Sequence, residues 1–170
     1  LVPYLEHNTI HLGKLTVNFV PYYLNGSNDK YSQTYYDILC GMDLTAFPSY
    51  YEPWGYTPLE ALAFRIPTLT TTLAGFGLWV KTHYTAPHPG ITVLERTDSS
   101  YDSVVKGVVE RIREIASLSK ETRPAYRDNA REVASIALWE NQIIYYREAY
   151  SMALEKVSSL KGAYASAKGK

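Results

Sequence analysis

Two glutamates and a clear helix start make Phe47–Phe64, with the sequence FPSYYEPWGYTPLEALAF, the stretch of this 170-residue chain best suited to chemistry. Thr57 and Pro58 predict a helix in which Thr57 is the N-cap and Pro58 is the first helical residue. The backbone N–H groups from about Gly55 to Leu59 would then lie at the positive end of that helix. A helix start of this kind favours an anion, and especially a phosphate.

The two carboxylates of this stretch, Glu52 and Glu60, lie eight positions apart and have different explanations. Glu60 follows the expected cap by three residues, so a capping box and a ligand-binding role account for it about equally well. Glu52 stands in an aromatic loop between Tyr51 and Pro53, where no structural role requires a charge. We therefore expect a functional role for Glu52, and both explanations stay open for Glu60.

The elements that must position these residues follow from the apolar pattern. Short β-branched runs alternate with helical segments up to about residue 96, and the spacing is helical afterwards. This alternation predicts an α/β fold, a Rossmann-like parallel sheet with flanking helices and a helical C-terminal segment, in which ligands bind at the carboxyl ends of strands. The expected strands are 15–20, 44–47, 68–72 and 91–94, and the expected helices between them are 35–40, capped by Ser32 or Thr34, and 58–64.

Three helices are expected in the C-terminal part. Ser99 and Asp102 predict a capping box at the first helix start, and Thr122 and Pro124 begin the second helix. An apolar stripe at spacings of four, three, four and three marks the third: Trp139, Ile143, Tyr146, Tyr150 and Ala153. The pattern leaves open whether the last two helices are continuous near Leu138. We expect one domain over 1–157 and a flexible tail over 158–170.

Composition narrows the function classes. The 17 Lys and Arg balance the 17 Asp and Glu, so the basic footprint of a nucleic-acid-binding protein is missing. No apolar stretch approaches the roughly 20 residues that a membrane span needs. The single cysteine, Cys40, fits a reducing cytoplasm. The four histidines are scattered and no Asp-x-Asp motif occurs, so we expect no metal cofactor.

A resemblance to a known family rests on the string YYEPWGYTPLEA, Tyr50–Ala61, followed by Ile66-Pro67-Thr68 and by Leu73–Gly77. Together these segments resemble the C-terminal half of eukaryotic-type glycogen synthases, which are retaining glycosyltransferases of GT-B fold. The pair Glu52 and Glu60 matches the paired-glutamate signature of retaining GT-B transferases. The resemblance covers about 15–77, with a weaker match in the terminal helices.

The resemblance implies a role for each matching position. Glu52 would be the catalytic residue near the transferred glucose, and Glu60 would accept hydrogen bonds from the ribose hydroxyls. The donor diphosphate would meet Gly55, Tyr56 and Thr57. Tyr35 would stack on the base, although a ring packed in the core is its structural alternative and Tyr36 is a competing candidate.

The resemblance also implies the partners and the reaction. The donor would be UDP-glucose or ADP-glucose, and glucose would pass to the end of an α-1,4-glucan without a metal cofactor. The acceptor and a phosphate-binding Arg/Lys pair would be bound by an N-terminal domain upstream of Leu1, so we expect the chain to be a piece of a longer protein and inactive alone. A homo-oligomer is one expectation for the full-length enzyme.

Two alternatives to this function remain. The chain could be a non-catalytic nucleotide-sugar-binding module, or part of a different retaining GT-B glycosyltransferase.

Gly75-Phe76-Gly77 is interpreted as a turn that lines the donor cleft. Arg123, Arg127 and Arg131 are interpreted as a solvated helix face rather than as the glucose 6-phosphate sensor of the resembled family.

Overall fold

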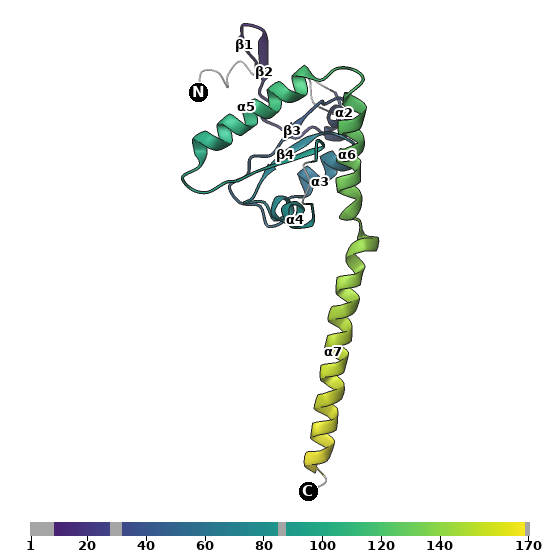
Figure 1. The fold of residues 1–170 in the computed structure, drawn as a ribbon. Helices are drawn as coiled ribbons and strands as arrows, with labels where there is room; N and C mark the ends of the chain where they lie inside the picture. Colours follow the sequence, from purple (N-terminus) through teal and green to yellow (C-terminus); the bar gives the residue numbers. More distant parts are fainter. Residues whose placement is uncertain (1–8, 28–31, 85–87, 169–170) are drawn as a thin grey trace. The chain divides into compact units, whose positions relative to one another are not determined.

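The computed structural model describes residues 9–27, 32–84 and 88–168 of the chain (Figure 1). The backbone contacts divide the chain into two units, Leu1–Met42 and Asp43–Lys170. Each unit has its own sheet, and each is described by itself below.

The first unit contains a β-hairpin and a short helix. Strand β1 (Thr9–Leu12) pairs antiparallel with β2 (Leu15–Asn18) through a two-residue connection that begins with Gly13, whose φ is 63°. The expectation that residues 15–20 form a strand of the parallel sheet was therefore wrong, because a connection this short permits only antiparallel pairing.

Helix α2 (Tyr35–Cys40) of the first unit begins as the sequence predicts. Of the two candidate caps, Thr34 is the N-cap, and it forms a reciprocal capping box with Asp37. The backbone N–H of Asp37 donates to the Thr34 hydroxyl at 3.3 Å, and the N–H of Thr34 donates to the Asp37 carboxylate at 2.9 Å. The Thr34 hydroxyl also donates to the Asp37 carboxylate, at 2.6 Å, and this bond together with the one from the Thr34 N–H holds the pKa of Asp37 below its usual value.

The second unit confirms the α/β fold. Its three strands, β3 (Thr45–Ala46), β4 (Thr68–Thr71) and β5 (Ile91–Leu94), form a parallel sheet in the order β3-β4-β5. Helix α3 (Tyr56–Ala63) connects β3 to β4, and α4 (Gly75–His83) connects β4 to β5. All four residues of β4 are buried, as expected for a central parallel strand covered on both faces.

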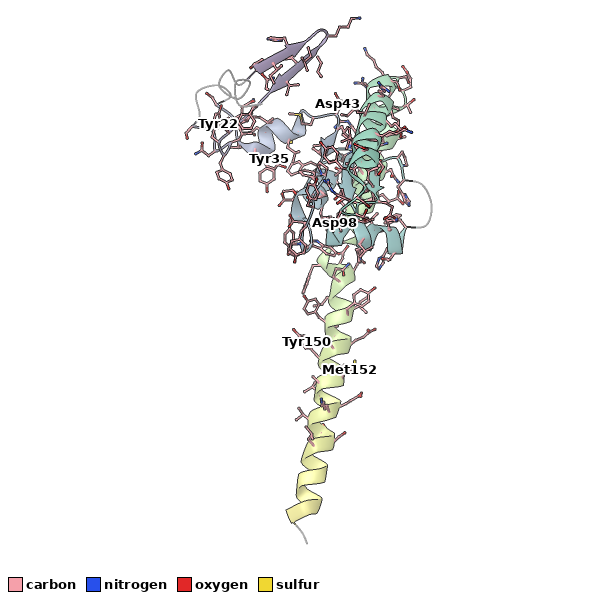
Figure 2. The ribbon with its side chains drawn as sticks, turned by 90° about the vertical axis from the view of Figure 1, so that its left-hand side faces the viewer. Tyr22, Tyr35, Asp43, Asp98, Tyr150 and Met152 are labelled. Carbon is pink, nitrogen blue, oxygen red and sulfur yellow. The ribbon has the colours of Figure 1, made fainter. Side chains whose placement is uncertain are left out.

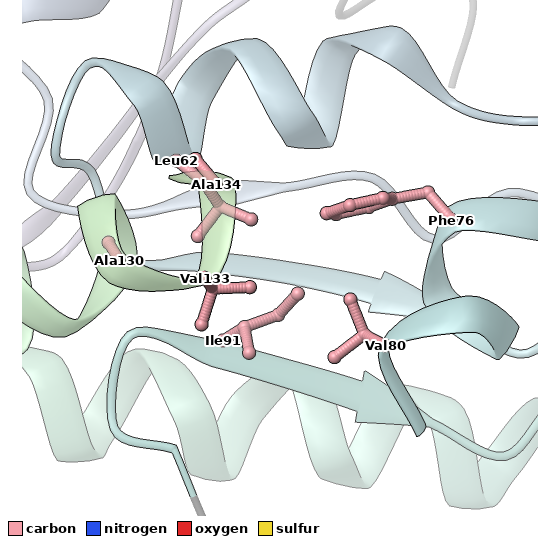
Figure 3. Packing of buried hydrophobic residues seen from close by; sticks show 7 residues of the cluster. All are labelled: Leu62, Phe76, Val80, Ile91, Ala130, Val133 and Ala134. Carbon is pink, nitrogen blue, oxygen red and sulfur yellow. The ribbon is translucent and has the colours of Figure 1, made fainter. Parts of the chain in front are cut away.

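The main core lies where α3, α4 and α6 (Arg123–Ile136) cover one face of this sheet (Figure 3). Its buried members are Leu62, Phe76, Val80, Ile91, Ala130, Val133 and Ala134. Helix α5 (Tyr101–Ser117) packs on β5, and Leu94 fills the space above Gly107. The core thereby fixes the carboxyl edge of the sheet, where the predicted site lies.

Helix α5 starts later than the sequence predicts. Its N-cap is Ser100 and its first residue is Tyr101, so the predicted capping box of Ser99 and Asp102 does not form. The Ser100 hydroxyl instead accepts a hydrogen bond from the N–H of Thr97 at 2.8 Å. The Ser99 hydroxyl, which the prediction gave to the helix, instead lies 3.3 Å from the hydroxyl of Thr97, so both serines bond within a local turn.

The last two helices are separate. Helix α6 ends at Ile136, and α7 (Trp139–Lys168) follows after a break at Ala137 and Leu138. We expected a flexible tail over residues 158–170. In the structure, residues 158–168 are the last part of helix α7. Among the described residues, no helix has both the length and the apolar character needed to cross a bilayer.

Candidate functional site

Five of the six predicted site residues lie in the second unit, around the connection from β3 to α3. Glu52 and Gly55 belong to the loop, and Tyr56, Thr57 and Glu60 belong to α3. Tyr35 lies in the first unit, on α2, where its ring meets that of Tyr36 edge-on at 5.3 Å. The structure of the second unit therefore brings the two glutamates and the helix start together, and Tyr35 is not part of that unit.

Glu52 is fixed by its backbone to the segment after β4. Its N–H donates to the carbonyl of Leu73 at 3.1 Å, and its carbonyl accepts from the N–H of Gly75 at 3.0 Å. The N–H of Phe76 donates to the Trp54 carbonyl at 2.6 Å. These bonds satisfy the first donors of α4, so the interpretation of residues 75–77 as a turn was wrong: they begin a helix whose start holds the loop.

Gly75 makes this attachment possible. A Cβ atom at position 75 would lie 2.2 Å from the carbonyl oxygen of Pro53, a distance that no side chain tolerates. On the same side, the half-buried ring of Trp54 packs against Phe76 at 5.7 Å and Trp79 at 5.9 Å between ring centroids. The end of the loop that carries Glu52 is thus fixed by both backbone and aromatic contacts.

Arg96 holds the other end of the loop and was missed in the sequence. This side chain is 5% exposed and follows β5 at the carboxyl edge of the sheet. Its Nη1 donates to the carbonyl of Pro48 at 2.6 Å, and its guanidinium carbon lies 3.5 Å from the centre of the Tyr50 ring. An arginine placed just after a strand that ends at the ligand edge was the signal that could have revealed it.

The start of α3 differs from the prediction in a way that strengthens the site. Gly55 is the N-cap, in the left-handed region at φ 101°, and no side chain caps the helix. Thr57 is therefore the second helical residue rather than the cap. The glycine therefore starts the helix two residues earlier than the Thr-Pro pattern indicates. Pro58 still lies in the first turn, where a missing N–H costs little.

This shift changes the meaning of Glu60. As the fifth residue of α3 it is too far from Gly55 to form a capping box, so the structural explanation for its carboxylate is wrong. The first turn leaves the N–H groups of Gly55, Tyr56 and Thr57 without partners inside the helix. The three donors that were predicted to bind a diphosphate are thus the ones that α3 leaves available.

The N–H donors at the start of α3 lie beside the side chain of Glu52. A Cβ at Gly55 would lie 3.3 Å from the Cγ atom of Glu52, so the Glu52 side chain lies directly against the N-cap of α3. Glu52 and Glu60 are both half-buried, whereas Tyr56 and Thr57 are exposed. The site can bind an anionic group at the helix start with one carboxylate beside it.

The comparisons with known proteins point to one family. A family model described as glycogen synthase matches residues 8–167. The chain is 30% identical over 145 residues to a glycogen [starch] synthase of Caenorhabditis elegans, covering 85% of this chain and 22% of that protein. It is 31% identical over 137 residues to the liver glycogen [starch] synthase of Mus musculus, covering 80% and 20%. The chain thus spans about a fifth of the length of these relatives.

Proposed function

Because the chain belongs to the glycogen synthase family, we propose that it is the donor-binding part of a retaining glycosyltransferase that transfers glucose from a nucleotide-glucose to an α-1,4-glucan. One observation carries the proposal. The uncapped start of α3, with Gly55 as its N-cap, presents backbone donors directly beside the Glu52 carboxylate at the carboxyl edge of a parallel sheet.

The helix start would act on the leaving group. Negative charge builds on the diphosphate as the bond to the glucosyl carbon breaks, and N–H groups aimed at its oxygens stabilise that charge in the transition state. We assign this task to Gly55, Tyr56 and Thr57, with the Thr57 hydroxyl as a further donor. No step assigned to these residues requires a metal ion, so EDTA should leave the affinity for nucleotide unchanged.

The two carboxylates would have separate tasks. Glu52, held by the loop beside the helix start, would face the glucosyl unit and stabilise the positive charge that develops there. Glu60, which has no capping partner, would accept hydrogen bonds from the ribose hydroxyls. The base would stack on Tyr35.

The remaining tasks belong to residues outside this chain. The chain corresponds to about a fifth of its curated relatives, so we assign acceptor binding and further phosphate contacts to the rest of the protein. The 170 residues alone should bind nucleotide without transferring glucose. We place the protein in the cytoplasm, where nucleotide-sugars are available and the exposed Cys40 would remain reduced.

Calorimetric titration of the chain with UDP and with ADP tests the donor site. We expect one nucleotide to bind more tightly than the other, and we expect Glu60→Ala and Tyr35→Ala to weaken that binding about tenfold, the loss of roughly one hydrogen bond or stacking contact. Glu148→Ala, on exposed α7, is the matched control and should bind as the unaltered chain does.

Three results would contradict parts of the proposal. Equal weakening by Glu148→Ala and Glu60→Ala would show that the effect is not specific to the site. A folded chain that binds neither nucleotide would overturn donor binding by these residues alone. If the complete protein bound the nucleotide-sugar but transferred no glucose, a non-catalytic module would be the better account.

A further inference from the structure

Strand β4 has threonines at positions where a central parallel strand usually has apolar side chains. Thr68, Thr70 and Thr71 are all fully buried. A buried hydroxyl costs free energy unless it forms a hydrogen bond, so each of the three needs a structural or functional reason. Their hydrogen-bond partners differ, and this difference separates their roles.

Thr68 joins β4 to β3 at the start of both strands. Its hydroxyl donates to the carbonyl of Ile66 at 2.8 Å and lies 2.9 Å from the hydroxyl of Thr45. Figure 2 labels one residue near each edge of the sheet, Asp43 before β3 and Asp98 after β5, and Thr68 belongs to the Asp43 edge. Thr68 therefore acts at the edge opposite the candidate site.

Thr71 ends β4 at the carboxyl edge and holds segments on both sides of Glu52. Its hydroxyl donates to the carbonyl of Ser49, three residues before Glu52, at 2.9 Å. Its own carbonyl accepts from the N–H of Ala74 at 3.2 Å, and Ala74 pairs with Glu52 in a parallel bridge. A Cβ at Gly77 would lie 2.3 Å from the same carbonyl oxygen, so α4 packs directly on it.

We propose that Thr71 is a positioning residue for Glu52, which holds the carboxylate in its place beside the start of α3. The inference rests on the function proposed above for Glu52. Because Thr71 is fully buried, it acts through the backbone of the loop rather than on a substrate. A misplacement of about 1 Å can lower a rate about 100-fold, so a carboxylate that acts on the glucosyl unit must be held firmly.

The contacts that remain without the Thr71 hydroxyl make this effect local. Arg96 still binds the neighbouring carbonyl of Pro48, and its own N–H donates to the Thr72 hydroxyl at 3.0 Å. The chain should therefore still fold when the Thr71 hydroxyl is removed, with the segment around Glu52 released. The start of α3, which would bind the diphosphate, has its own N-cap and should be unaffected.

Three variants isolate the hydroxyl. Thr71→Val removes it with almost no change of shape, and Thr71→Ser retains it. Thr70→Val is the matched control, because Thr70 lies on the same strand, is equally buried, and has a hydroxyl with no hydrogen-bond partner in the part of the chain that the structure describes.

Amide hydrogen exchange of the 170-residue chain, followed by NMR, tests the hold on Glu52. The Glu52 N–H reports the loop, and the Thr68 N–H, bonded to the Gly90 carbonyl at 2.9 Å, reports the sheet. In Thr71→Val we expect exchange at Glu52 to become about tenfold faster or more, and exchange at Thr68 to change much less. Thr71→Ser and Thr70→Val should stay within about threefold of the unaltered chain at both amides.

Steady-state kinetics of the complete protein test the consequence for glucose transfer. Thr71→Val should lower kcat about 10- to 100-fold and leave the KM for the nucleotide-glucose within about threefold, because only the position of Glu52 changes. Thr71→Ser should restore kcat to within about threefold of the unaltered protein. Thr70→Val should leave both constants unchanged.

The results that would overturn the inference differ from those that would overturn the proposed function. Equal acceleration at Glu52 and Thr68 in Thr71→Val, or none at Glu52, would show that Thr71 does not position the loop. Equal losses of kcat in Thr71→Val and Thr70→Val would exclude the hydroxyl as the cause. An unaltered complete protein that transfers no glucose would overturn the proposed function and any effect of Thr71 on transfer, and exchange at Glu52 would still decide whether Thr71 holds that residue.

Discussion

The loop before α3 and the helix α7 belong to the same unit but are stabilised in opposite ways. The loop has no repeating hydrogen bonds of its own, and its position is set by contacts from Gly75, Arg96 and Thr71, the last of which donates its hydroxyl to the Ser49 carbonyl at 2.9 Å. Helix α7 satisfies its backbone within itself and leaves the side chains of residues 144–160 exposed.

This difference shows where substitutions will have an effect. Removing one contact from the loop releases the segment that carries Glu52, because each contact comes from a different part of the sheet. Replacing one side chain on α7 removes nothing on which the folded unit depends. Stability should therefore respond strongly to changes around the loop and weakly to the same changes on α7.

Among changes at the loop, Gly75→Ala should have the largest effect. Its Cβ would meet the Pro53 carbonyl oxygen at 2.2 Å, so either the loop or the start of α4 must move. We expect the free energy of unfolding, measured by urea denaturation, to fall by about 2–4 kcal/mol. Gly41→Ala is the control, because its Cβ would have only a 3.4 Å contact with a carbonyl; similar losses for both variants would contradict the close approach at Gly75.

Arg96→Met should have the next largest effect. It removes the hydrogen bond to Pro48 and the contact with the Tyr50 ring, so the unfolding free energy should fall by about 1.5–3 kcal/mol and nucleotide affinity should fall with it. Arg147→Met makes the same change at an exposed position of α7 and should stay within about 0.5 kcal/mol. An unchanged unfolding free energy in Arg96→Met would show that Arg96 does not hold the loop in place.

Glu114→Gln should have a smaller effect that depends on pH. Burial tends to raise the pKa of Glu114, but hydrogen bonds from Arg111 and Tyr126, at 2.8 Å each, outweigh it and lower the pKa below its usual value of 4.5. A lowered pKa in the folded chain contributes stability above pH 4.5, and this contribution is lost as pH falls through the folded pKa.

Urea denaturation between neutral pH and about pH 3 tests whether the stability contributed by Glu114 is lost on acidification. Glu114 is 44% exposed, so solvent screening limits its contribution to a few tenths of a kcal/mol. We expect Glu114→Gln to be slightly less stable at neutral pH and to lose less stability on acidification than the unaltered chain. The control is Glu110→Gln, one turn away on α5. If both variants lost the same unfolding free energy on acidification, the effect would not come from the lowered pKa of Glu114.

The sequence predicted the fold class well because the pattern of short apolar runs and helices is local. It did not predict the hairpin of residues 9–18, because nothing in a β-branched run shows whether its partner strand is parallel or antiparallel. The start of α3 was misplaced because Gly55 can adopt φ 101°, and this freedom competes with the Thr-Pro pattern that follows it.

The candidate site was predicted in part for a similar reason. Glu52 and the donors at Gly55, Tyr56 and Thr57 are close in sequence, so their pattern alone locates them. Arg96 acts on a loop 48 residues earlier in the chain, and only the register of the parallel strands brings the two together. Contacts made through the sheet are not encoded in any local spacing.

Ile144→Ala on α7 should have the smallest effect and completes the comparison. This side chain is 54% exposed, so little apolar surface returns to water when it is shortened. Alanine also has the higher helix propensity, which offsets that loss, and the unfolding free energy should change by less than about 0.5 kcal/mol. The same truncation at fully buried Ile66 should cost about 2–5 kcal/mol. A large loss from Ile144→Ala would mean that α7 packs on the rest of its own chain, and the contrast between the loop and the helix would then fail.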